Sequence, residues 1–204
     1  MNRSGLDRRQ AIRTLATGAV GAATSVMWVE SLSALARQQA HAHVADAAIA
    51  AQDWTPRVLT ARQNDAVITL IELIIPDTGP APGTPGAKAA RVNRFVDTVL
   101  QGATPADREK FIKGLAWIDA RSKTLFGKEF VAASAADQTA LLTRISKDGN
   151  PDGEDPIGPE FFQAIKVMTI NGYYTSEIGL HQELGDDGVL FMPQFLGCTH
   201  PEHQ

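Results

Sequence analysis

Apolar residues recur at helical spacing along most of the chain beyond residue 58, and almost no segment alternates as a strand would. The clearest apolar stripe consists of Val67, Leu70, Ile71, Ile74 and Ile75. Thr60 and Gln63 form a capping box at its start, and Pro76 ends it. The pattern therefore predicts a helix between Thr60 and Pro76.

Similar signals predict four more helices. The second covers 87–100, the third begins at Thr104-Pro105, the fourth begins at Ser134, and the fifth runs from Glu160 to about Leu184. The segment 76–86 between the first two helices is rich in proline and glycine, so it is predicted to be an irregular loop. The expected fold is an all-α, small, irregular bundle of about five helices.

The N-terminal region has the composition of an export signal. Four arginines and one aspartate precede an uncharged stretch from Thr14 to Val29, which is too short and too weakly apolar to span a membrane. The pair Arg8-Arg9 resembles the twin-arginine export motif, whose route carries folded proteins. We therefore expect a signal peptide at 1–36, a linker or arm at 37–58 and the helical domain at 59–204. Two cleavage sites are open, Ala34-Leu35-Ala36 and Ala40-His41-Ala42; a basic first helix of the domain is the alternative.

Composition excludes several classes of function. The chain has 204 residues, with 19 basic and 23 acidic side chains and a net charge of −4. Removal of 1–36 takes four arginines and two acids, which leaves 15 basic and 21 acidic residues and a net charge of −6. An acidic protein is a poor match for nucleic acid. A single cysteine excludes an intrachain disulfide and a multi-cysteine metal site, and no phosphate-binding glycine motif occurs. No cofactor-binding or metal-binding residue is assigned.

Two short clusters leave an alternative function open, that of an independent ion-binding helical module. Asp148, Asn150 and Asp152 before Gly153 resemble the first half of a calcium loop. The twelfth position holds Pro159, however, and Glu160 comes one place late, so a polar connector explains the pattern equally well. In the tail, Cys198, His200 and His203 have the residue types of a zinc or copper site but lack an evident fourth ligand.

The stretch from Ile170 to Gly179 contains both tyrosines of the chain, Tyr173 and Tyr174. A strip of small residues, Gly172, Ser176 and Gly179, would let another backbone approach closely. Tyrosine beside such a strip is typical of a partner interface, and an internal helix–helix contact would need the same residues. Glu177 lacks a partner at the spacing of a catalytic pair. We expect these six residues to form a partner interface, with no catalytic residue among them.

The motif Gly172-Tyr-Tyr-Thr-Ser-Glu-Ile-Gly179, with Gln182-Glu183-Leu184 and Phe195-Leu-Gly-Cys198, resembles the gluconate 2-dehydrogenase subunit 3 family. Similar segments lie at 74–78, 84–87, 114–119 and 126–130, so the resemblance runs from about Leu59 to Cys198. A longer segment before Thr84 departs from the family pattern.

The resemblance implies a non-catalytic small subunit of a periplasmic sugar dehydrogenase complex. In such complexes a large flavoprotein of the glucose–methanol–choline type holds FAD and oxidises the sugar, and a cytochrome c subunit or another acceptor takes the electrons. The small subunit is thought to assist folding, twin-arginine export and assembly of the flavoprotein. The sugar oxidised would be set by the active site of the flavoprotein.

Overall fold

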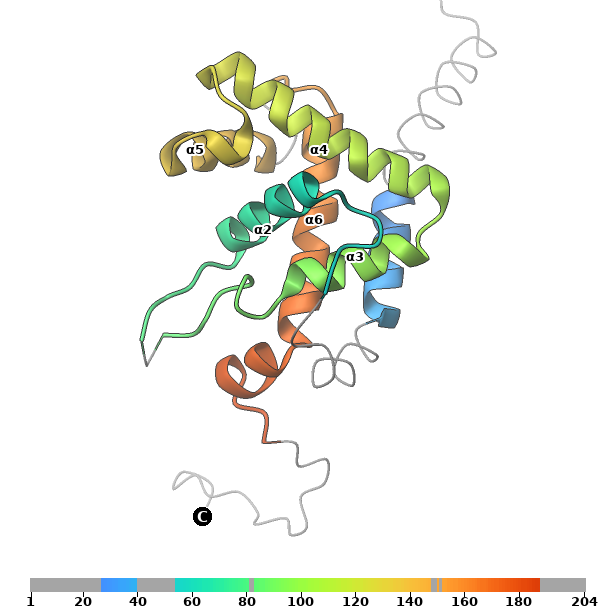
Figure 1. The fold of residues 1–204 in the computed structure, drawn as a ribbon, viewed down its shortest axis with the longest axis vertical. Helices are drawn as coiled ribbons and strands as arrows, with labels where there is room; N and C mark the ends of the chain where they lie inside the picture. Colours follow the sequence, from blue (N-terminus) through green and yellow to red (C-terminus); the bar gives the residue numbers. More distant parts are fainter. Residues whose placement is uncertain (1–26, 40–53, 81–82, 148–149, 151, 188–204) are drawn as a thin grey trace, which may run out of the picture.

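The fold, taken from a computed structural model, is described for residues 27–39, 54–80, 83–147, 150 and 152–187. These residues form helices joined by turns and loops, with no strand among them. In chain order the elements are a helix at 27–39, α2 (Ala61–Ile74), α3 (Val92–Gly102), α4 (Pro105–Phe126), the 3₁₀ turn η1 (Phe130–Ala132), α5 (Ala135–Ser146), α6 (Ile157–Tyr174) and the π-helical η2 (Ile178–Glu183). The predicted all-α bundle is confirmed (Figure 1).

The predicted helix starts are confirmed where a side chain caps the first turn. The Thr60 hydroxyl accepts a hydrogen bond from the Gln63 amide at 3.3 Å, and the Gln63 side chain accepts one from the Thr60 amide at 2.8 Å. Thr104 caps α4 through the Asp107 amide. Ser134 caps α5 in the same way, at 3.2 Å from the Asp137 amide. Each cap satisfies a backbone donor that the helix leaves unpaired, so the sequence signal has a direct physical cause.

Two predicted boundaries are wrong by more than one helical turn. The second helix begins at Val92 rather than 87, because the Lys88 amide donates to the Glu72 carboxylate at 2.9 Å and Arg91 adopts a left-handed φ of 56°. The fifth helix ends at Tyr174 rather than near Leu184, and the chain continues as η2. A contact with α2 thus overrides helical periodicity at the first place, and a local turn around Ser176 does so at the second.

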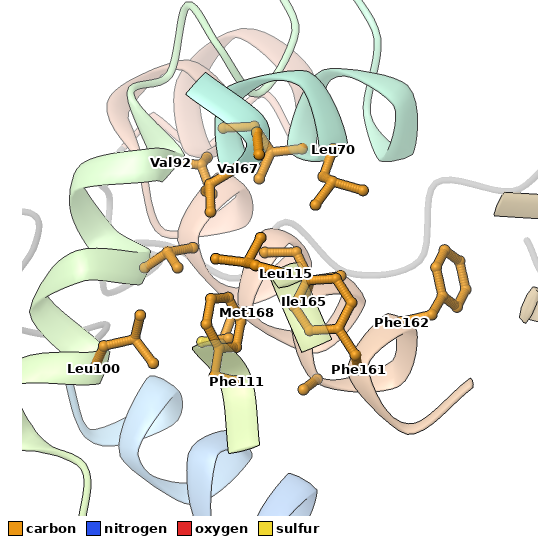
Figure 2. Packing of buried hydrophobic residues seen from close by; sticks show 14 of the residues in the cluster. Val67, Leu70, Val92, Leu100, Phe111, Leu115, Phe161, Phe162, Ile165 and Met168 are labelled. Atoms are coloured by element: carbon orange, nitrogen blue, oxygen red, sulfur yellow. The ribbon is translucent and has the colours of Figure 1, made fainter. Parts of the chain in front are cut away.

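Helix α6 is the central element of the fold. It packs against α2, α3, α4 and α5 and runs through the middle of the molecule (Figure 1). Figure 2 shows side chains of α2, α3 and α4 that converge on those of α6. The labelled members of this core are Val67, Leu70, Val92, Leu100, Phe111, Leu115, Phe161, Phe162, Ile165 and Met168. Each fully buried side chain of this size contributes about 1.5–3 kcal/mol, so the core fixes α6 firmly.

A buried carboxylate positions the chain that enters α2. Asp97 of α3 is 2% exposed, and its two oxygens accept hydrogen bonds from three consecutive backbone amides. The amides belong to Arg57 at 2.8 Å and to Val58 and Leu59 at 3.0 Å each. Arg57 and Val58 are the last residues of the predicted linker 37–58, and Leu59 is the first residue of the predicted domain. Asp97 therefore holds the chain just before the Thr60 cap against α3.

The helix at 27–39 packs onto the domain (the blue ribbon in Figure 1). Trp28, Leu32 and Ala36 are buried in the same hydrophobic core as α6. This helix covers the last ten residues of the predicted signal peptide 1–36 and the first three of the predicted linker. None of the described helices is long and apolar enough to cross a membrane.

Candidate functional site

The stretch Ile170 to Gly179 lies where α6 ends and η2 begins. Tyr173 is fully buried there, and its hydroxyl donates a hydrogen bond to the backbone carbonyl of Pro85 at 2.8 Å. The same hydroxyl lies 3.1 Å from a carboxylate oxygen of Glu183 in η2. The Thr84 hydroxyl donates to that carboxylate oxygen as well. Tyr173 therefore joins three parts of the chain, namely α6, the 76–86 loop and η2.

Burial raises the pKa of the Tyr173 hydroxyl above its ordinary value, and the neighbouring Glu183 carboxylate adds to the rise. The hydroxyl is protonated at neutral pH, and its single hydrogen can be donated either to the Pro85 carbonyl, which is the shorter contact, or to the Glu183 carboxylate. Tyr173 thus has a structural role inside this chain. A partner protein would reach it only if this end of the domain opened.

The predicted strip of small residues also has an internal role. A Cβ on Gly172 would lie 2.7 Å from Phe95 and 3.0 Å from Val92, so a glycine lets α6 approach α3 closely. The Ser176 hydroxyl donates to the Tyr173 carbonyl at 2.6 Å and accepts from the Gly179 amide at 3.1 Å. Gly172, Ser176 and Gly179 are all buried. The close approach expected of them is made within the domain.

The other two predicted interface residues face solvent at least in part. Tyr174 is partly exposed, and its ring meets the Tyr173 ring edge to face, with centroids 5.2 Å apart. Glu177 is exposed. Ile170, one turn before Tyr174 on α6, is 39% exposed, and Leu184 just after η2 is 60% exposed. We call Ile170, Tyr174, Glu177 and Leu184 the α6-end set. Each is at least partly exposed, so a partner can contact it without rearrangement.

Two residues of the calcium-like loop are already engaged by the protein. The Asn150 amide group donates to the Glu154 carbonyl at 2.6 Å and accepts from the Glu154 amide at 2.9 Å. Asp152 pairs with Lys147 at 2.8 Å. Glu160 accepts a hydrogen bond from the Trp28 indole at 3.0 Å. Asp148 lies outside the described residues.

Glu154, in the connector between α5 and α6, forms a buried ionic cluster that holds α4 and α5 together. The sequence did not indicate this cluster. The Glu154 side chain is 2% exposed and pairs with Arg121 of α4 at 2.7 Å and with Arg144 of α5 at 2.8 Å. Arg121 and then Arg144 hold the pKa of Glu154 below its ordinary value, against the effect of burial. Only the fold brings these residues together, since 33 positions separate Arg121 from Glu154.

The remaining candidates cannot be placed. Cys198, His200 and His203 lie outside the described residues, as do Arg8 and Arg9. Within the part of the chain that the structure describes, no three histidine, cysteine or acidic side chains are grouped so that they could hold a metal ion.

A small cavity of about 280 Å³ opens between α2, α4 and η1. Arg62 lines this cavity and pairs with Asp119 at 3.0 Å and with Glu129 at 2.6 Å. Lys123 also pairs with Glu129, at 2.6 Å. These ion pairs engage the charges of Arg62, Asp119 and Glu129 in the cavity wall. The arrangement is that of a surface salt-bridge network rather than of an acid–base pair aimed at a substrate.

Most of the helical domain matches the model of a known protein family. A family model described as gluconate 2-dehydrogenase subunit 3 matches residues 61–189, which is more than half of the chain and includes α2 to η2. No curated protein and no solved structure matches the chain.

Proposed function

This chain belongs to the gluconate 2-dehydrogenase subunit 3 family, and from that premise we propose that it is the non-catalytic small subunit of a periplasmic, FAD-dependent sugar or gluconate dehydrogenase complex. Its partner would be a large flavoprotein of the glucose–methanol–choline type, which holds the FAD and oxidises the substrate. The family match over residues 61–189 carries this proposal.

The role proposed for the small subunit is to bind the flavoprotein and assist its folding, export and assembly. The α6-end set supports such a role, because it combines exposed apolar side chains with one tyrosine and one carboxylate. Ile170 and Tyr174 are four residues apart on α6, so they lie on one helix face. Tyrosine is one of the residue types that supply most of the binding energy at protein interfaces, and the apolar side chains around it exclude water.

The construction of this end also favours a preformed binding surface. Tyr173 fixes the end of α6 to Pro85 and to Glu183, so Tyr174 and Leu184 are presented from a braced part of the fold. A preformed surface loses less conformational entropy on binding than a flexible one. The export signal with Arg8 and Arg9 belongs to the same proposal, since a folded complex would cross the membrane by the twin-arginine route.

The proposal is tested by purifying the full-length protein gently from the periplasm with a C-terminal tag, after expression from its native locus. The absorption spectrum and the identity of each co-eluting chain are then recorded. A near-stoichiometric flavin-containing partner is the expected result, and that partner would also reveal the substrate class. A colourless protein that elutes alone would refute the proposal.

A further inference from the structure

The helix at 27–39 has the apolar face of a core helix. Trp28, Leu32 and Ala36 follow one another at intervals of four residues, which places them on one side of the helix. Their exposed fractions are 3%, 0% and 0%. Val29 and Leu35 add partly buried contacts to the same core. A segment that serves only as an export signal would not need to complete the hydrophobic core of the domain.

Polar contacts tie the same helix to two other elements. The Trp28 indole N–H donates to the Glu160 carboxylate in the first turn of α6 at 3.0 Å. The Ser31 hydroxyl donates to the Asp107 carboxylate in the first turn of α4 at 3.1 Å. The Lys110 ammonium group lies 6.0 Å from the centre of the Trp28 ring, within the range of a cation–π contact. Polar contacts therefore fix the position of this helix on the domain, in addition to the apolar contacts.

This arrangement bears directly on where the signal can be removed. The small-x-small site Ala34-Leu35-Ala36 lies within the helix, and Ala36 is fully buried. Proteases cut exposed and locally unfolded segments, so cleavage of a packed helix depends on how often it opens. In a protein that folds before export, this site would be inaccessible to the protease.

We propose that the helix at 27–39 is retained in the exported protein as part of its core, and that signal cleavage removes neither this helix nor any part of it. Residues 27–39 are then an integral element of the subunit. Both candidate cleavage sites, at Ala34–Ala36 and at Ala40–Ala42, would go unused. This inference rests on the proposed export of the chain.

The first test is the intact mass, with N-terminal sequencing, of the tagged full-length protein recovered from the periplasm. A chain that begins at or before Met27 is expected. A chain that begins anywhere after Met27, for example at Arg37 or His43, overturns the inference. The co-eluting chains form a separate readout: a shortened chain bound to a flavoprotein refutes only the inference, whereas a solitary chain that keeps the helix refutes only the proposed function.

Trypsin digestion of the purified full-length chain provides a second test, of the packing on which the inference rests. The measured quantity is the rate of cleavage after Arg37, which is exposed but lies within the helix. Leu32→Ala removes a fully buried side chain and should speed this cleavage at least about tenfold, because the helix opens more often. Glu30→Ala, at an exposed position of the same helix, should leave the rate unchanged. Equal rates in wild type and Leu32→Ala would overturn the inference.

Discussion

The buried hydroxyl of Tyr173 donates a hydrogen bond across 2.8 Å to the backbone carbonyl of Pro85, 88 positions earlier in the chain. This bond connects the end of the central helix to the irregular loop that follows α2. The loop has its own attachments at the base, since the Glu72 carboxylate accepts hydrogen bonds from the Asp77 and Lys88 amides. One buried tyrosine thus holds the part of the domain that carries the family's most specific motif.

Replacement of Tyr173 should lower the stability of the isolated subunit. Tyr173→Phe removes the hydroxyl and leaves the ring, so the free energy of unfolding should fall by about 1 kcal/mol. Tyr173→Ala also empties a fully buried site and should cost about 3–5 kcal/mol. Urea denaturation followed by circular dichroism measures both values. Tyr174→Phe, on the partly exposed neighbour, is the matched control; equal effects of the two phenylalanine variants would contradict the role given to the Tyr173 hydroxyl.

Removal of the Asp97 carboxylate should destabilise the entry to α2. Asp97→Ala leaves the amides of Arg57, Val58 and Leu59 without their acceptor, which should lower the free energy of unfolding by about 3 kcal/mol. Asp97→Asn keeps one oxygen and should cost less. Asp65→Ala, at an exposed position of α2, should change stability by less than about 0.5 kcal/mol in the same denaturation experiment. A loss in Asp97→Ala no larger than in this control would contradict the assignment.

The Glu154 cluster should make stability depend on pH. Because Arg121 and Arg144 lower the pKa of Glu154 in the folded protein, the ionised carboxylate stabilises the fold above the ordinary glutamate pKa of about 4.3. This contribution is lost as the pH falls through the lower pKa of the folded state. Glu154→Gln should therefore be less stable than wild type by about 2 kcal/mol at pH 7. The difference between the two should shrink as the pH falls below about 4.3.

Denaturation curves measured at several pH values test this prediction. Glu109→Gln is the control, because Glu109 forms a solvent-exposed pair with Lys113 and its profile should stay close to that of wild type. A difference between wild type and Glu154→Gln that is constant across the pH range would show that the charge of Glu154 is not the cause.

Calcium should not stabilise the protein. Asn150 is bound to the Glu154 backbone, Asp152 to Lys147 and Glu160 to Trp28, so a bound ion would have to break contacts that the fold already makes. Thermal unfolding in millimolar calcium should match unfolding in a chelator to within about 1 °C, with magnesium as the control cation. A rise in melting temperature specific to calcium would revive the interpretation of this loop as an ion site.

The helix caps could be predicted from the sequence, whereas the start of α3, the end of α6 and the Glu154 cluster could not. The caps at Thr60, Thr104 and Ser134 could be predicted because each acts within one turn. The end of α6 could not, because there the Ser176 hydroxyl binds the Tyr173 carbonyl and the Gly179 amide, which favours a turn over a longer helix. The same limit applies to the candidate site: composition singled out Tyr173 and Tyr174 as a pair, and only the fold separates the buried residue from the partly exposed one.

Substitution of Tyr174 should weaken the complex and spare the subunit. If Tyr174 is a main contact of the flavoprotein, Tyr174→Ala should cost about 2 kcal/mol of binding energy, or roughly a 30-fold loss of affinity. Its circular dichroism spectrum should match that of wild type, because the side chain is partly exposed and lies outside the fully buried core. Val131→Ala is the matched control, since Val131 is also an exposed apolar residue, 44% exposed, but lies on η1. The measurement is the flavin absorbance recovered per mole of tagged subunit after joint expression with the flavoprotein; recovery by Tyr174→Ala as complete as by Val131→Ala would exclude Tyr174 from the interface.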